Sequence, residues 1–305
     1  MFIVDKISNK NVLLEHIHVF NESISCRIFP NLGASIQTLI FNKIDIIKGI
    51  HFSEDGLLSY KKMYQSAILF PFVGRIPNGK YNYNNESYQL NINEHKRTNA
   101  LHGLLYDKVF SIDSLTASVS EAEIKLSYQS NGKLKGFPFK FKFQITYLIS
   151  NKGIKVSFKI SNKDTNTFPF GCGWHPYFLS NNLASSTLSF SSNEKVISNE
   201  ELIPIGLTKN KEASSFKLKN NYFDDTFILQ KNKINYKTNN YKLQITVNKN
   251  DNNFLQVYTP LDRKSVAIEP LSCVPNAFNN KNGLLELHPN KNYKWNLNLE
   301  IKTYE

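Results

Sequence analysis

Glu269 is a carboxylate in a sequence context that is typical of buried residues. It follows the apolar run Ser265–Ile268 and precedes Pro270. Burying an unpaired carboxylate is costly, so a glutamate in such a place is usually paired or functional. Burial would also raise its pKa toward the range in which a carboxylate serves as a general base. The sequence therefore indicates proton transfer as the chemistry of this segment.

A second cluster of chemically capable residues surrounds His175, in the run Phe-Gly-Cys-Gly-Trp-His-Pro-Tyr-Phe from 170 to 178. Histidine titrates near neutrality and can move protons, although a buried core histidine is the alternative. Trp174 and Tyr177 offer flat faces of the kind on which sugars stack. Cys172 and His175 have a spacing seen in metal sites, but a lone pair of this kind is weak evidence for zinc. We expect no metal.

Three further polar positions interrupt apolar stretches. Arg75 precedes a proline–glycine turn, where its planar fork could hold hydroxyls or carboxylates, or simply face solvent. His102 stands beside Gly103 in a loop and is either a donor to a ligand or a solvated residue. Asp224 and Asp225 are adjacent acids, which are common in turns.

In this order, these segments resemble the aldose 1-epimerase (galactose mutarotase) family, from about Phe70 to Asn279. The motifs are Gly-Arg-Ile with a following Gly-x-Tyr, Leu-His-Gly, His-Pro-Tyr-Phe, Asp-x-x-Phe, and Glu-Pro with Asn-Ala-Phe-Asn. The resemblance implies that Glu269 is the general base and His175 the general acid.

The resemblance also implies roles for the other polar residues. His102 would contact the sugar and support ring opening, while Arg75 and Asp224 would bind sugar hydroxyls. Asp224 is preferred over Asp225 because of its spacing to Phe227. Tyr177 and Trp174 complete the predicted substrate-binding set. The reaction would interconvert α and β anomers of a hexose and would need no cofactor, because a base and an acid suffice to open and close the ring.

One departure from the pattern bears on the substrate. The galactose-specific branch usually has asparagine before the arginine, whereas this chain has Gly74. A mutarotase for a hexose 6-phosphate is therefore an alternative, with Lys80, Arg97 or Arg263 as candidate phosphate ligands. A non-catalytic carbohydrate-binding protein on the same fold is a second alternative.

The elements that must position these residues are expected to be strands. Apolar and polar residues alternate over 139–147, 154–160, 243–247 and 294–301, and more briefly over 24–29, 87–92 and 123–128. Alternation with period two is typical of strands with one buried face. Only residues 54–69 could hold a short helix. The pattern predicts an all-β, antiparallel sandwich or barrel in one domain, 1–305. The family resemblance narrows this to a mostly antiparallel β-supersandwich with few short helices and the sugar in a groove across one sheet.

The composition of the chain limits the classes of partner that we expect it to bind. The net charge is +12, but the lysines are scattered, so no nucleic-acid surface is predicted. No run of about 18 apolar residues is present, and the start lacks the apolar core of a secretion signal. Three separated cysteines fit a reducing compartment. We expect a cytoplasmic monomer or homodimer whose partner is a small-molecule sugar, a hexose or hexose phosphate, with no membrane contact.

Overall fold

The computed structural model describes residues 1–8, 14–211, 214–248 and 253–304. Within these ranges the regular structure is mostly antiparallel strand, with two α-helices, as the alternating pattern predicted. None of the helices described is long and apolar enough to cross a bilayer.

Eleven of the described strands pair one after another in a first series that begins with the N-terminal strand. In order of pairing it contains β1 (Ile3–Ile7), β2 (His16–Phe20), β3 (Ile24–Phe29), β4 (Ser35–Phe41), β5 (Ile44–Ile47), β17 (Tyr177–Leu179), β24 (Ser265–Leu271), β23 (Asn253–Tyr258), β21 (Asp224–Lys237), β18 (Thr187–Ser198) and β19 (Pro204–Lys209).

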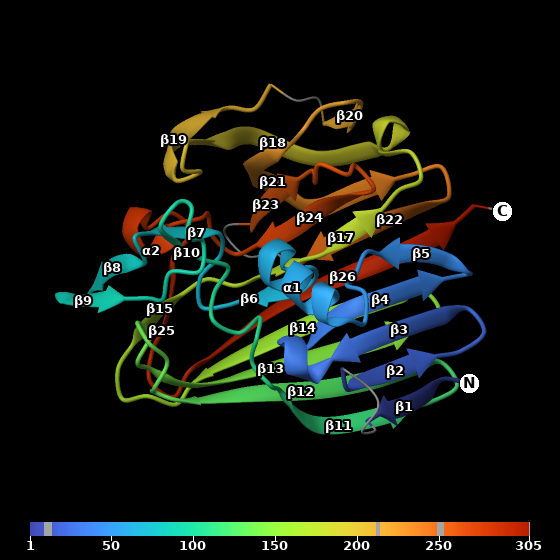
Figure 1. The fold of residues 1–305 in the computed structure, drawn as a ribbon, viewed down its shortest axis with the longest axis horizontal. Helices are drawn as coiled ribbons and strands as arrows, with labels where there is room; N and C mark the ends of the chain where they lie inside the picture. Colours follow the sequence, from blue (N-terminus) through green and yellow to red (C-terminus); the bar gives the residue numbers. More distant parts are fainter. Residues whose placement is uncertain (9–13, 212–213, 249–252, 305) are drawn as a thin grey trace.

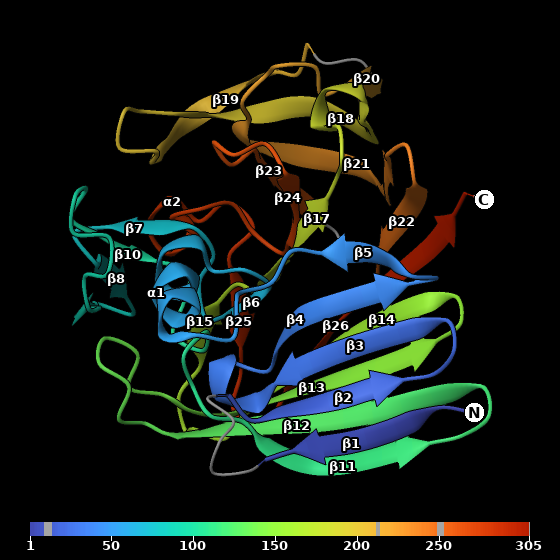
Figure 2. The same ribbon diagram turned by 45° about the vertical axis from the view of Figure 1, so that its right-hand side comes forward.

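A second series meets the first on β21, whose early residues pair with β23 and whose late residues pair with β22. It contains β11 (Ser111–Ala117), β12 (Glu121–Asn131), β13 (Lys140–Ser150), β14 (Gly153–Asn162), β26 (Asn292–Thr303) and β22 (Tyr241–Val247). Figures 1 and 2 show strands β2–β4 (blue) lying over β12–β14 (green), so the two series form facing layers.

Short elements border these layers. The pairs are β6 (Ala67–Leu69) with β16 (Gly173–His175), β7 (Arg75–Pro77) with β10 (Asn99–Leu101), β8 (Lys80–Tyr83) with β9 (Glu86–Gln89), β15 (Phe168–Phe170) with β25 (Leu285–Leu287), and β18 with β20 (Ser215–Lys217). The helices are α1 (Glu54–Met63) and α2 (Ala277–Asn280), with 3-10 turns at Pro30–Leu32 and Leu183–Ser185.

The main core lies between the two layers and is built by the alternation seen in the sequence. In β13 and β14 the apolar set that includes Phe143, Tyr147 and Phe158 is buried, while the intervening lysines face outward. Tyr147 also donates its hydroxyl to the Ala34 carbonyl of the opposite layer at 2.6 Å. The hairpin predicted for residues 139–160 is thus confirmed, with a turn at 151–152.

The short helix predicted within residues 54–69 is confirmed as α1. Ser53 caps α1 by accepting from the Gly56 amide, and acidic residues follow in the first turn, where the helix dipole favours them. The helix ends at Tyr64, which adopts a left-handed conformation. Residues 67–69 then form β6, whose backbone pairs with β16 in the sheet.

A smaller apolar cluster lies on the outer face of β24, opposite the main core. Ile268 of this strand belongs to the main core, whereas Leu271 packs in the smaller cluster with residues of α1, including Tyr60. All seven residues of β24 are buried as a result. Any polar side chain on this strand must therefore find its partners inside the protein.

Backbone packing around Gly103, which follows β10, generates a stability prediction. Gly103 has φ +81°, and a Cβ there would lie 2.7 Å from the Phe70 backbone nitrogen. Gly103→Ala should therefore lower the free energy of unfolding by about 2 kcal/mol, measured by urea denaturation. Gly206→Ala is the matched control, since no atom lies within 4 Å of its added Cβ. Equal stability of the two variants would contradict this account.

Candidate active site

Glu269 and His175 face each other inside the protein. The Oε1 atom of Glu269 lies 3.4 Å from Nε2 of His175, and the two residues are only 2% and 4% exposed. They come from β24 and β16, which are adjacent strands. The two residues that the sequence singled out for proton transfer are therefore brought together.

Strand register places both side chains on the outer face of the sheet. His175 pairs with Ala67, and Tyr177, two residues later on β17, pairs with Ala267 of β24. Side chains of paired residues and of alternate residues share a face. Glu269 lies two residues beyond Ala267 and so projects from the same face as His175.

Burial controls the charge of this pair. Loss of solvent raises the pKa of Glu269 well above its ordinary value, with a further increase from the Asp224 charge and an opposing effect of Arg75. Loss of solvent also lowers the pKa of His175 to about 3. Both shifts favour the uncharged forms, so burial favours a protonated Glu269 and a neutral His175 over the charge-separated pair.

Arg75 and His102 reach this region on the small β7–β10 ribbon. Arg75 pairs with Leu101, and the His102 amide donates to the Gly74 carbonyl at 2.9 Å. The His102 ring meets that of His175 edge to face, with centroids 4.9 Å apart. Burial lowers the pKa of His102 well below its ordinary value, with added effects of His175 and Arg75, so its imidazole is neutral.

Gly74 lets this ribbon approach the strand that bears Glu269. Its φ is +56°, and a Cβ at this position would lie 2.6 Å from Cβ of Pro275, which follows β24. A side chain at this position would therefore require Pro275 to shift.

Asp224 lies on the same sheet face as Glu269, whereas Asp225 does not. Asp224 pairs with Tyr258, and its carboxylate accepts from the Gln256 amide at 2.7 Å. Gln256 in turn pairs with Glu269. Asp225 points to the other face, where Lys195 binds it at 2.9 Å. The geometry supports the preference for Asp224, and it adds Gln256, which the sequence did not single out.

The aromatic residues of the predicted set lie differently. Tyr177 stacks on His175 with ring centroids 5.0 Å apart and donates its hydroxyl to the Met63 carbonyl at 2.9 Å. It therefore supports His175 from inside the protein. Trp174 is 0% exposed, and its ring packs on Phe178 in the main core. Because neighbouring residues on a strand point to opposite faces, Trp174 faces away from His175 and is not carried into the proposed site.

The residues considered for phosphate and metal binding are dispersed. Arg263 donates to the Asn221 and Lys219 carbonyls, and Lys80 is exposed on β8. Arg97 lies 3.3 Å from a carboxylate oxygen of Glu94, which also binds Arg75. Within the ranges that the structure describes, no group of three or more His, Cys, Asp or Glu side chains could hold a metal ion.

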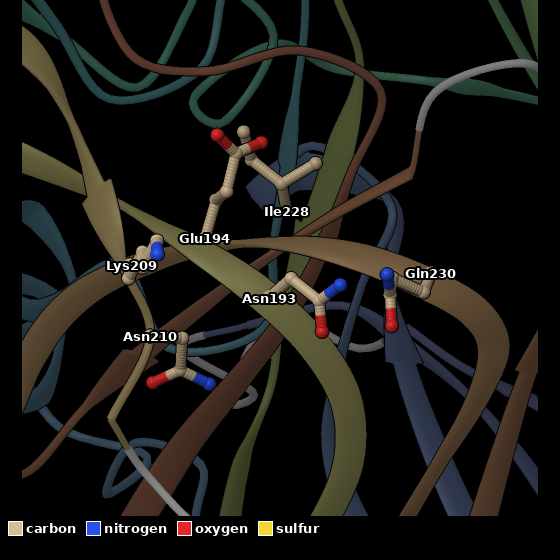
Figure 3. A pocket seen from close by; sticks show the side chains of 6 residues that line it. All are labelled: Asn193, Glu194, Lys209, Asn210, Ile228 and Gln230. Carbon is tan, nitrogen blue, oxygen red and sulfur yellow. The ribbon is translucent and has the colours of Figure 1, made fainter.

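A hollow of about 540 Å³ lies farther along the same sheet, at β18, β19 and β21. Figure 3 shows Glu194 and Ile228, a cross-strand pair, projecting together at one side of it. The other lining residues are Asn193, Lys209, Asn210 and Gln230. None of the residues predicted for the site lines this hollow.

Comparison with known proteins identifies the family of the chain. Residues 16–300 match the aldose 1-epimerase family. Uncharacterized protein YihR of Escherichia coli K12 is 30% identical over 259 residues, which cover 76% of this chain and 77% of YihR.

The fold is also shared with solved structures. A galactose mutarotase-like protein from Clostridium acetobutylicum superposes with a TM-score of 0.87 at 16% identity, covering 100% of this chain and 99% of that one. Galactose 1-epimerase from Lactobacillus acidophilus gives 0.79, also at 16% identity, with coverage of 100% and 99%. At such identities the structural likeness establishes the fold, a galactose mutarotase-like β architecture. Together with the match over residues 16–300, these findings show that the chain belongs to the aldose 1-epimerase family.

Proposed function

We propose that the protein interconverts the α and β anomers of a hexose by acid–base ring opening and closure. The observation that carries the proposal is the buried Glu269–His175 pair, with 3.4 Å between carboxylate oxygen and imidazole nitrogen. In a cyclic sugar the anomeric hydroxyl and the ring oxygen are bonded to the same carbon. Two proton-transfer groups this close can therefore serve both oxygens at once.

In the proposed reaction Glu269 accepts the proton of the anomeric hydroxyl while His175 donates a proton to the ring oxygen. The bond between C1 and the ring oxygen breaks, and C1 becomes an aldehyde carbonyl. After rotation about C1–C2, the hydroxyl formed from the former ring oxygen attacks the opposite face of the aldehyde. His175 recovers its proton and Glu269 returns its own, so the enzyme ends as it began.

The protonation preference of the site suits the open-chain stage. Ring opening leaves Glu269 protonated and His175 neutral, which is the form that burial favours through the raised pKa of one and the lowered pKa of the other. Glu269 must be ionised and His175 protonated only while the sugar ring is closed. Arg75, whose charge opposes the rise in the pKa of Glu269, helps the carboxylate form exist at that stage.

Two alternatives keep the same groove. A hexose 6-phosphate substrate is supported by Arg97, whose guanidinium shares the Glu94 carboxylate with Arg75. A non-catalytic sugar-binding protein would need hydroxyl-binding groups such as Arg75 and Asp224. It would not need a carboxylate facing an imidazole in a desolvated site, which makes catalysis the better explanation.

Removal of either proton-transfer group should abolish anomer exchange. We expect Glu269→Gln and His175→Asn each to lower the enzymatic rate at least about 100-fold, because each loses general acid or base catalysis. Polarimetry of freshly dissolved α-D-glucose and α-D-galactose measures this. The exposed residues Glu121 and His288 provide matched controls, Glu121→Gln and His288→Asn. Full activity in either site variant would refute the assigned pair.

The same assay with α-D-glucose 6-phosphate tests the phosphate alternative. If that sugar is the substrate, its kcat/KM should greatly exceed that of glucose, and Arg97→Ala should remove most of the difference because an exposed cation is lost. Equal effects of Arg97→Ala on both sugars would exclude Arg97 as a phosphate ligand. Tight sugar binding without any anomer exchange would favour the non-catalytic alternative.

The pH profile should show no acid loss at the ordinary pKa of histidine. The pKa of His175 is about 3, and that of Glu269 is raised well above its usual value. Protonation of His175 therefore contributes no change in kcat/KM between about pH 5 and about pH 7. Measurement in buffers of constant ionic strength, corrected for buffer catalysis, checks this. A decline with a midpoint near pH 6.5 would contradict the lowered pKa.

Glu269→Gln should also stabilise the fold above acidic pH. Because the folded pKa of Glu269 is raised, the folded chain binds this proton more tightly than the unfolded chain. That advantage exists at low pH and is lost as the pH rises through the folded pKa, whereas glutamine has no such dependence. We expect the Tm of the variant to exceed that of the parent by about 1–3 °C at pH 8 and by less at pH 5, by calorimetry. A lower Tm at pH 8 would contradict this.

A further inference from the structure

Glu94 is a half-buried carboxylate that belongs to none of the sequence motifs. It lies between β9 and β10, and its side chain is 13% exposed. Three side chains donate to it: Arg75, Arg97 and Asn99, the last at 2.8 Å. Burial opposes its ionisation, but the hydrogen bonds from Arg75 and Asn99 prevail and lower its pKa. Glu94 is therefore a fixed anion beside the proposed site.

Glu94 occupies one edge of the Arg75 guanidinium. Arg75 donates from Nε at 2.9 Å and 3.1 Å to the two carboxylate oxygens, and from Nη2 at 2.9 Å. The Nη1 group and the second hydrogen of Nη2 form the other edge of the plane. Arg75 can therefore present only this second edge to a sugar.

The backbone ties Glu94 to the ribbon that carries Arg75 and His102. Glu94 and Asn99 form a β-bridge, and Asn99 lies at the start of β10 opposite Pro77 of β7. The neighbouring Asn93 side chain binds both the amide and the carbonyl of Leu101, the residue before His102. The carboxylate is thus held at a defined place relative to the arginine that it binds.

Two further carboxylates lie within the electrostatic influence of Arg75. Asp224 and Glu269 both experience the Arg75 charge, which opposes the desolvation that raises the pKa of each. A mobile Arg75 could form an ion pair with either one. Pairing with Glu269 would lower its basicity, and pairing with Asp224 would remove an acceptor for sugar hydroxyls.

We propose that Glu94 is a positioning residue for Arg75. It holds one edge of the guanidinium so that the other edge faces the sugar hydroxyls, and it prevents Arg75 from collapsing onto Asp224 or Glu269. The inference rests on the proposed function of the site. The competing explanation is that Glu94 only joins the 90–99 segment to β7.

A double-mutant cycle between Glu94→Gln and Arg75→Ala separates these explanations. If Glu94 acts through Arg75, Glu94→Gln should raise KM about tenfold with a smaller change in kcat, because hydroxyl binding is misplaced. In the Arg75→Ala background the same substitution should change kcat/KM by less than about twofold. Equal effects in both backgrounds, or no effect of Glu94→Gln alone, would overturn the proposal.

Controls keep the outcome interpretable. Glu86→Gln, on the exposed surface of β9, should leave KM unchanged. If Glu94→Gln does not fold, Glu94→Asp replaces it in the cycle, since it keeps the charge but shortens the reach to Arg75. The four proteins are also titrated with α-D-glucose by calorimetry, so coupling can be obtained from Kd. A parent protein that binds sugar without exchanging anomers would refute the proposed reaction, while the cycle in Kd would still decide the role of Glu94.

Discussion

Removal of the Glu269–His175 pair from water is the constraint on which the rest of the site depends. A charged carboxylate or imidazolium is costly to desolvate, and here both groups lie within the protein at 3.4 Å. When Glu269 and His175 share a single proton, this desolvation cost is smaller, because the pair has no net charge whichever residue holds the proton. The fold can therefore place acid and base in a dry setting without a permanent uncompensated charge.

The surrounding elements maintain that setting. Ala67 and Leu271 belong to the apolar cluster under α1, and Tyr177 supports the imidazole through stacking and through its bond to the end of that helix. The short helix thus covers the face of the sheet that bears Glu269 and His175. Charged groups enter from the other side on the β7–β10 ribbon, where Arg75 already has its own anionic partner. Solvent screens fixed charges only weakly near such a buried site, so the position of Arg75 has a large effect on the groups around it.

Sequence patterns predicted the strands and singled out Glu269 for local reasons, whereas the pairing of Glu269 with His175 as base and acid came from the family resemblance and stays a prediction. Period-two alternation identifies strands such as β13, and an acid ending an apolar strand is conspicuous without any tertiary information. Strand alternation also accounts for what the residue types alone missed. Trp174 was included because an indole suits sugar stacking, yet its position next to His175 on one strand turns it to the core.

The remaining site residues depend on tertiary contacts. Glu94 and Gln256 occur in segments with no motif, and their relevance arises from pairing with Arg75 and Asp224, which are distant in sequence. The separation of Asp224 from Asp225 likewise required knowing which face of β21 carries Lys195. The exact end of α1 within residues 54–69 also depends on tertiary contacts, because residues 67–69 form a strand by pairing with β16.

The burial of both tryptophans has a consequence for optical experiments. The chain has two, Trp174 and Trp295, and each is 0% exposed in the main core. Their emission should be that of indoles in an apolar medium and should shift strongly to the red when the core opens. A sugar bound on the other side of the sheet touches neither ring. Intrinsic fluorescence is therefore a sensitive signal for unfolding and an insensitive one for ligand, so a flat fluorescence titration says nothing against binding.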